Sequence, residues 1–315
     1  MRRPPPHLHT FAWIFLLWRI KMIAGLCSVP FRQIAMLYGT AWKEERTTEL
    51  VKRAFQLGFR GVDTACQPKH YQEHLVGQAL KELIDEGVIT RQDVWIQTKY
   101  TSIDGQDANK VPYDKDAPLE EQVRQSVEVS RQNLQVEQID SLVLHGPVKG
   151  RADLTMKAWR AMENAVDEGK VAHLGVSNVY DLPFFEYLYT EARYKPIVLQ
   201  NRFYVQTGFD RELRDFCRER NIRYQSFWTL TANPGLLKSP PVQRLAQTYN
   251  ATSSQVLYRY IIDSSGGQPL SGCKDPQHIQ EAVAVQSLGP LTEADVASIE
   301  EVMYAGRKGS SKREL

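Results

Sequence analysis

The sequence predicts an α/β fold of the (β/α)8 class, a TIM barrel, and three observations lead to it. From residue 36 onward, short apolar runs alternate with longer amphipathic stretches, and eight such pairs fill roughly 270 residues. The apolar runs are short and continuous, as expected of parallel strands buried on both faces. A doubly wound open sheet is the main alternative, but the chain lacks the G-x-G-x-x-G turn typical of that class.

The elements follow one another in a regular order. The predicted strands are 35–42, 59–65, 93–100, 139–147, 171–178, 196–203, 222–228 and 268–272. The predicted helices are 45–58, 73–87, 119–135, 156–170, 181–192, 211–220, 240–250, 253–263, 275–285 and 291–303. Apolar residues recur at helical spacing in these stretches, and Gly58 and Gly169 stop two of them.

Composition bounds the class of protein. The chain has 315 residues, 42% of them hydrophobic and 24% charged, which is ordinary for a soluble globular protein. A formal net charge of +2 is too small to indicate nucleic acid or an acidic membrane surface as a partner. The 4 cysteines are far apart and form no C-x-x-C pair, which favours a reducing compartment, so we expect a cytoplasmic location.

The two ends of the chain differ from its middle. "MRRPPPHLHT" is basic and precedes the apolar run "FAWIFLLW", which is far shorter than the ~20 residues of a membrane span. An anchor, an organelle signal and a start wrongly placed upstream of Met22 all stay open. We therefore divide the chain into an N-terminal extension (1–30), one barrel domain (31–305) and a flexible tail (306–315). The sequence does not indicate an oligomeric state.

Polar residues end four successive predicted strands. Asp63 ends the second, Lys99 the third and His145 the fourth, and Ser177 with Asn178 ends the fifth. Each could be an ordinary solvated or capping residue, but the C-terminal ends of barrel strands meet on one face, where barrel enzymes carry their chemistry. Chance would have to place all four. The ordered set therefore indicates a site.

The residue types indicate proton transfer. Tyr71 follows Asp63 in a polar loop, and a buried lysine beside a phenol favours the phenolate, which lowers the pKa of the phenol. A carboxylate beside that lysine keeps it protonated, and a neighbouring histidine can orient a carbonyl group. Such a site delivers a proton to a developing alkoxide. The hydride must come from a cofactor, because no side chain supplies one.

The chain resembles the aldo-keto reductase family. The resemblance rests on "GFRGVDTA", "HLVGQAL", "IQTKY", "IDSLVLHGP", "LGVSN" and "LQNRF" in that order, and it covers about residues 36–305. It implies a (β/α)8 barrel that reduces small aldehydes and ketones with NADP(H). It also implies a catalytic tetrad, and the matching residues are Asp63, Tyr71, Lys99 and His145.

The resemblance further implies a set of cofactor contacts. Ser177, Asn178 and Gln200 match the residues that hold the nicotinamide, and Phe227 matches the aromatic ring that stacks on it. Contacts to the 2′-phosphate are expected near the last strand, from the candidates Ser271, Lys274 and His278. No metal ligands are implied.

Two departures from the family pattern concern function. The usual interval between the aspartate and the tyrosine is five residues, whereas Asp63 and Tyr71 stand eight apart, and His70 is the nearest substitute acid. Gly272 and His278 occupy the positions of the Lys and Arg that usually clamp the 2′-phosphate. A phosphate would lose its bidentate partner, which weakens the preference for NADPH and leaves NAD(H) as an alternative.

We therefore carry two hypotheses of different class. The first is an NAD(P)H-dependent carbonyl reductase with Tyr71 as proton donor. The second is a regulatory barrel that binds the cofactor without efficient turnover, which the altered tyrosine loop and the missing phosphate clamp motivate. A barrel hydrolase or isomerase would need a metal cluster or paired acids at strand ends, and the sequence offers neither.

Overall fold

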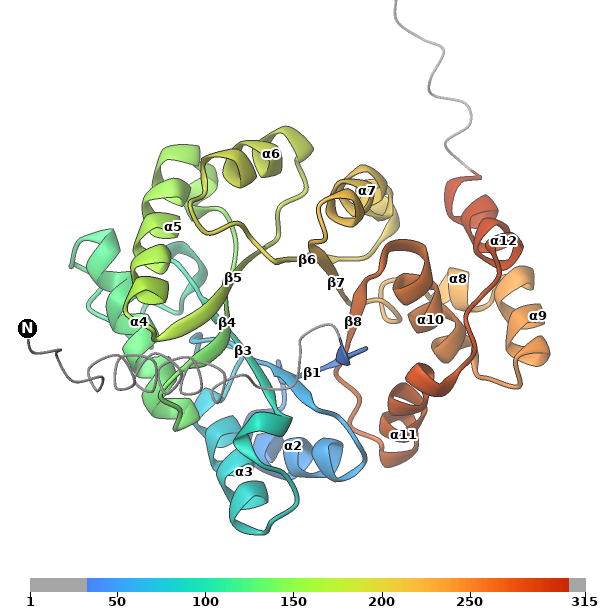
Figure 1. Ribbon diagram of the computed structural model, residues 1–315, viewed down its shortest axis with the longest axis horizontal. Coiled ribbons are helices and arrows are strands. Elements are labelled where there is room, and N and C mark those ends of the chain that lie inside the picture. The colour runs from blue at the N-terminus through green and yellow to red at the C-terminus, as the bar shows by residue number, and fades with distance from the viewer. Residues whose placement is uncertain (1–32, 306–315) are drawn as a thin grey trace, which may run out of the picture.

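The computed structural model describes residues 33–305, and its centre is a closed barrel of parallel strands (Figure 1). The strands follow one another around the barrel in chain order, and the last pairs with the first. They are β1 (Leu37–Gly39), β2 (Gly61–Asp63), β3 (Trp95–Tyr100), β4 (Ile139–Leu144), β5 (Val171–Ser177), β6 (Val198–Arg202), β7 (Arg223–Phe227) and β8 (Gln268–Ser271). The (β/α)8 barrel predicted from the sequence is confirmed.

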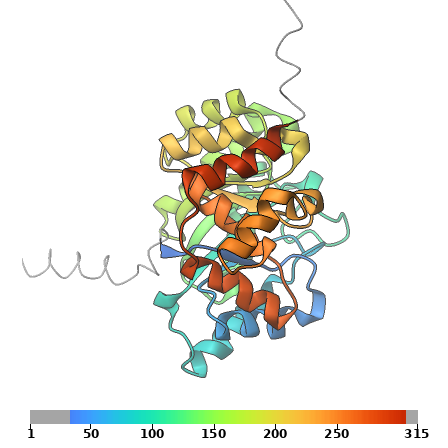
Figure 2. The same cartoon turned by 90° about the vertical axis from the view of Figure 1, so that its right-hand side faces the viewer.

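The helices form the outer ring of the barrel. They are α2 (Thr47–Gln56), α3 (Glu73–Asp85), α4 (Leu119–Leu134), α5 (Ala152–Asp167), α6 (Leu182–Glu191), α7 (Arg211–Glu219), α8 (Pro234–Leu237), α9 (Pro240–Thr248), α10 (Ser253–Ser265), α11 (Pro276–Ala284) and α12 (Glu293–Tyr304). Figure 2 shows the C-terminal helices, in orange and red, gathered on one side of the barrel. Across residues 33–305, no helix has the length and apolar character that crossing a membrane requires. The predicted extension (1–30) and tail (306–315) lie outside the described residues.

The observed elements differ from the prediction in length more than in place. The strand predicted at 35–42 is paired only over Leu37–Gly39, because the ladder ends where the loop turns away toward α2. The helix predicted at 156–170 begins earlier, at Ala152. The short helix α8 was not predicted, because its four residues are too few to show a period.

The apolar core lies mainly between the strands and the ring of helices. Trp159, Phe185 and Tyr260 are among its largest fully buried side chains. At the N-terminal end of the barrel, Ile34 and Trp95 belong to a second, small apolar cluster. Above that cluster the interior of the barrel is polar, and this departs from the branched apolar layers usual in such barrels. These polar side chains lead to the site.

Candidate active site

Three of the four residues of the predicted tetrad stand on neighbouring strands or directly after them. Asp63 is the last residue of β2, Lys99 lies in β3 and His145 follows β4. The strands β2, β3 and β4 are paired in parallel, so their C-terminal ends share one face of the barrel. Tyr71 comes from the loop between β2 and α3 and reaches the same place.

A buried ion pair forms the base of this group. The ammonium of Lys99 lies 2.5 Å from Oδ2 of Asp63, and both side chains are almost wholly buried. The ammonium also donates to the backbone carbonyl of Thr64 at 2.8 Å. Burial lowers the pKa of Lys99, but the charge of Asp63 works against burial, and the net pKa lies above its ordinary value. Lys99 therefore stays a cation.

Tyr71 lies against this cation. The Lys99 ammonium stands 5.2 Å from the centre of the Tyr71 ring. Burial raises the pKa of the phenol more than Lys99 lowers it, so the net direction is upward. The sequence led us to expect a lowered pKa, and that expectation was wrong because it left out the cost of desolvating a phenolate. The phenol therefore holds its proton.

His145 is neutral in this environment. Its Nδ1 lies 2.6 Å from the hydroxyl of Thr101, and its ring meets the Tyr71 ring edge-on at 6.0 Å between centres. Burial, and then the charge of Lys99, lower the pKa of His145 to about 3. A Thr101 hydroxyl that donates to Nδ1 leaves the imidazole proton on Nε2. His145 can then donate a hydrogen bond to a carbonyl oxygen.

The substitute acid His70 is placed differently. Its ring packs on Trp42, with 3.8 Å between ring centres, and its backbone carbonyl accepts from the Trp42 amide. Burial, and then the charge of Lys69, lower the pKa of His70. Tyr71, and not His70, is the acid in contact with Lys99.

A set of glutamines, of which the sequence predicted only Gln200 and for another role, holds the Asp63 carboxylate. Gln97 and Gln200 each donate to Oδ1 of Asp63, at 2.7 and 2.9 Å. Both also donate to Oε1 of Gln225, whose own amide nitrogen donates to Gln268 at 2.8 Å. Gln268 in turn donates to the backbone carbonyl of Ile34 at 2.6 Å. Gln97 and Gln200 thus direct N–H groups at the carboxylate, whereas Gln225 and Gln268 donate away from it, toward the N-terminal end of the barrel.

The predicted nicotinamide contacts lie beside this group, on β5 to β7. Ser177 donates to the backbone carbonyl of Gln200 at 2.7 Å, and Asn178 donates to the carbonyl of His145 at 2.8 Å. Asn178 has a left-handed backbone with φ of 56°, which asparagine tolerates better than most residues. Phe227 ends β7 and is only partly buried. The structure thus brings these four residues to the same mouth as the tetrad.

The predicted phosphate contacts lie after β8. Ser271 is buried and donates to the sulfur of Cys273, whereas Lys274 and His278 are exposed. A cation that the sequence reasoning missed lies in the same corner: Lys43 is buried and donates to the carbonyl of Gly272 at 2.9 Å. Burial, and then the charge of Lys274, lower the pKa of Lys43 to about 8.

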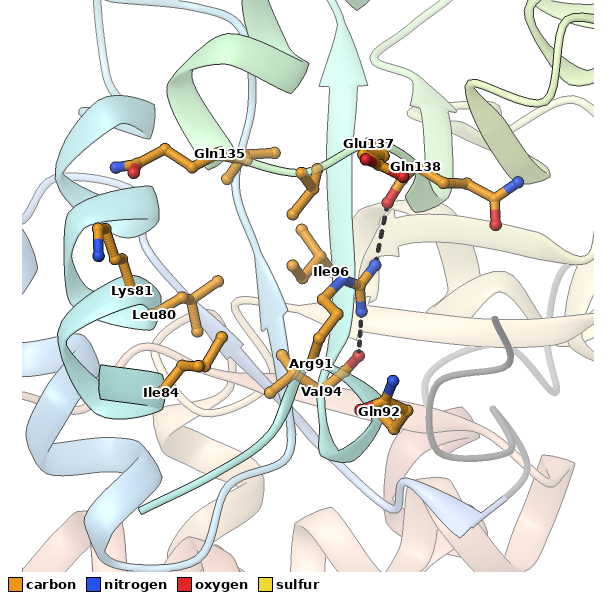
Figure 3. A pocket seen from close by; sticks show the side chains of 12 residues that line it. Leu80, Lys81, Ile84, Arg91, Gln92, Val94, Ile96, Gln135, Glu137 and Gln138 are labelled. Atoms are coloured by element: carbon orange, nitrogen blue, oxygen red, sulfur yellow. Dashed lines mark hydrogen bonds between the residues drawn. The ribbon is translucent and has the colours of Figure 1, made fainter. Parts of the chain in front are cut away.

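A cavity at the opposite end of the barrel takes no part in this group. It has a volume of about 440 Å³ and lies between α3 and the segments that lead into β3 and β4 (Figure 3). Arg91 crosses it and donates to the carbonyls of Val94 and Gln138 at 2.9 and 3.0 Å. Leu80, Ile84 and the residues around them make its walls largely apolar. In barrels of this class, that end contributes to stability and not to chemistry.

Comparison with known proteins connects this geometry to a family. The Aldo/keto reductase family matches residues 34–303. Glyoxal reductase of Bacillus subtilis (strain 168) is 29% identical over 269 residues, which cover 85% of this chain and 87% of the relative.

Two solved structures share the fold. One is MGS-M4, an aldo-keto reductase enzyme from a deep-sea metagenome library, which is 26% identical with a TM-score of 0.71 and covers 87% of this chain and 92% of its own. The other is an aldo-keto reductase of Bombyx mori in complex with NADP, which is 22% identical with a TM-score of 0.69 and covers 85% and 88%. With the fold, the site and a family match over nearly all of the described residues, the chain belongs to the aldo/keto reductase family.

Proposed function

We propose that this protein is an NADP(H)-dependent carbonyl reductase that acts on small aldehydes or ketones. The observation that supports it most is the contact of the Lys99 ammonium with both the Asp63 carboxylate and the Tyr71 phenol. A neutral His145 lies next to the same phenol. Together these groups can orient a carbonyl and protonate the oxygen as negative charge develops on it.

The mouth of the barrel suits a dinucleotide cofactor. Arg202 ends β6, and Lys43 and Lys274 lie in the loops that follow β1 and β8. None of the three forms an ion pair with another residue in 33–305. The phosphates of a cofactor would supply the negatively charged partners that these cations do not have within the described residues. Phe227 offers a partly exposed ring for stacking. One structural relative, an aldo-keto reductase from Bombyx mori, was solved in complex with NADP. When bound, the cofactor supplies the hydride.

The chain's own residues would handle the oxygen and its proton. The Nε2–H of His145 donates to the carbonyl oxygen and so orients the carbon toward the hydride donor. The phenol of Tyr71 then gives its proton to the oxygen as the C–O double bond becomes a single bond. Lys99 stabilises the phenolate that remains, and Asp63 holds Lys99 in position. Burial raises the pKa of Tyr71, so the phenol is fully protonated when the reaction begins.

Oxidation of NADPH by the purified protein, with a panel of aldehydes and ketones, tests this proposal. Glyoxal belongs in the panel because a relative is named for its reduction. Tyr71→Phe is expected to lower kcat by about 10²- to 10⁴-fold. Tyr187→Phe is the matched control, because this exposed phenol lies on α6 and outside the site. Absence of turnover with every carbonyl compound, in wild type and Tyr71→Phe alike, would reject the proposal.

A regulatory barrel that binds the cofactor without turnover is the second candidate. It is favoured by the interval of eight residues between Asp63 and Tyr71 and by Gly272 and His278 at the positions of the usual phosphate clamp. Quenching of tryptophan fluorescence by NADPH without any turnover would support it. A metal-dependent hydrolase has no comparable support, because residues 33–305 hold no group of three or more His, Cys, Asp or Glu that could bind a metal ion.

A further inference from the structure

Arg202 stands at the mouth of the barrel in an unusual setting. It is the last residue of β6, and its guanidinium carbon lies 4.0 Å from the ring centre of Trp228 and 5.2 Å from that of Tyr204. Phe227 lies 5.9 Å away and is the residue with which Arg202 is paired on the neighbouring strand. Three aromatic rings thus surround one cation and limit the directions in which it can point.

No carboxylate accompanies this cation. Arg202 forms no ion pair with any residue of the described part of the chain, and its buried Nε has no hydrogen-bond partner there. Arg214, which is buried among aromatic rings, differs in this respect: it donates to Phe209, Ser264 and Tyr304. A buried donor without a partner is unfavourable, because it has lost its hydrogen bond to water and gained none in the protein. The described part of the protein therefore leaves the Nε–H donor of Arg202 without an acceptor.

The backbone next to Arg202 carries a second cost. Trp228 has a φ of 55°, a left-handed conformation that is rare for a bulky side chain. This conformation places the indole, which is 51% exposed, against the guanidinium. Strained backbone of this kind is concentrated at sites of function. Here the strain maintains the stack on Arg202.

The guanidinium borders an open cavity. The cavity has a volume of about 490 Å³, and its lining consists of Arg202, Tyr204, Gln206, Trp228, Thr231 and Ala232. None of these residues is acidic, so the only formal charge in the lining is positive. A planar guanidinium is suited to bidentate pairing with a phosphate or a carboxylate, more than a lysine would be.

We propose that Arg202, Tyr204 and Trp228 form a binding site for an oxyanion, a phosphate or a carboxylate, on a ligand of the barrel mouth. The inference rests on the proposed function, which supplies two sources of such a group. One is the diphosphate of the cofactor, since Arg202 adjoins the ring expected to stack on the nicotinamide. The other is a carboxylate on the carbonyl substrate. Both sources use the same pairing with the guanidinium.

The first arm of the test measures cofactor binding. The variants are Arg202→Gln, Arg202→Lys and, as a charge-matched control, Arg211→Gln, whose guanidinium lies over the Tyr304 ring away from this cavity. Titration with NADPH, NADH and inorganic pyrophosphate, followed by tryptophan fluorescence, gives each Kd. If the diphosphate is the source, Arg202→Gln raises all three Kd values about tenfold or more, and Arg202→Lys raises them less. The control leaves them unchanged.

The second arm measures substrate selection. KM is compared for benzaldehyde and 4-carboxybenzaldehyde, which differ in one carboxylate. If the substrate is the source, Arg202→Gln raises KM about tenfold for the carboxylated aldehyde only. Arg202→Lys keeps the positive charge but cannot pair with two oxygens at once. It therefore measures the loss of bidentate pairing alone, even if Arg202→Gln is unstable.

The outcomes separate this inference from the proposed function. A rise in either arm supports the oxyanion site and identifies its source. Unchanged Kd and KM values in both arms, with turnover intact, overturn the site and leave the reductase proposal standing. If the wild type reduces no carbonyl compound but Arg202→Gln still weakens binding of NADPH and pyrophosphate, the reductase proposal fails and the site is supported.

Discussion

The two halves of the barrel mouth are built in opposite ways. On the side of β2 to β4, Asp63 accepts from Lys99, Gln97 and Gln200, so its carboxylate is fully engaged within the protein. On the side of β6 to β8, Arg202 and Lys274 carry charges that no acidic residue within 33–305 pairs. We infer that the first half keeps its geometry without a ligand and that a ligand completes the second. The same kind of substitution should then have different effects in the two halves.

Removal of a lysine should show the largest difference. Lys99→Met leaves the Asp63 carboxylate buried without its cation, which costs about 3–5 kcal/mol of stability. It also removes the charge that stabilises a Tyr71 phenolate, so turnover should fall by at least about 10²-fold. Lys274→Met is the control on the other half, and its stability should match that of the wild type because Lys274 is exposed. Urea unfolding and NADPH oxidation measure the two effects.

An equal loss of stability in both lysine variants would contradict the comparison. An unchanged stability of Lys99→Met would also contradict it, because the buried Asp63 carboxylate would then not depend on the Lys99 cation for its stability.

The glutamine chain should give the next effect. Gln97→Leu removes one donor from Asp63 and leaves an acceptor of Gln225 with one donor fewer, at a cost of about 1–3 kcal/mol. If the chain also orients Asp63, kcat should fall while the Kd for NADPH stays the same. Gln268→Leu, at the far end of the chain, should lower stability without lowering kcat. Equal effects of the two variants on kcat would show that the glutamines stabilise the barrel interior and do not orient Asp63 specifically.

These glutamines also show which site residues the sequence could predict and why the other contacts of the site could not be predicted. Asp63, Lys99 and His145 were predicted because each ends an apolar run, a signal that strand period alone provides. Gln97 and Gln225 stand inside such runs, and only the barrel's closure brings them 2.7 Å apart. The pairing of Arg202 with Trp228 depends on a positive φ, which the residue type argues against. Local pattern therefore identified residues at strand ends, but contacts across the barrel required the fold.

The pH dependence of stability tests the buried histidine. The pKa of His145 falls to about 3 in the folded protein, below its ordinary value near 6.5. Between these values the unfolded chain binds a proton that the folded chain does not. Stability from this residue is therefore complete above about pH 6.5 and falls at up to ~1.4 kcal/mol per pH unit below it. Urea unfolding at pH 7 and pH 5 should show a smaller loss for His145→Gln than for wild type.

The exposed His278→Gln is the control for the pH experiment, because its side chain lies on the surface of α11. It should lose as much stability between pH 7 and pH 5 as the wild type does. A loss in His145→Gln as large as that in the wild type would mean that His145 also binds a proton in the folded protein at pH 5. The donor to the carbonyl oxygen would then be an imidazolium and not the proposed neutral ring.

The smallest effect should come from adding charge to the half that a ligand completes. His278 lies in the first turn of α11, four residues after Lys274, and its side chain is exposed. His278→Arg supplies a guanidinium that can pair with a 2′-phosphate, so the Kd for NADPH should fall about two- to fivefold at low salt, the size of an exposed ion pair. NADH lacks that phosphate, and its Kd should not change. His74→Arg on α3 adds the same charge to the opposite half and should change neither Kd. An equal gain for NADH would place the new charge near the diphosphate, and the selection between NADPH and NADH would then have to arise from Lys43 or Lys274.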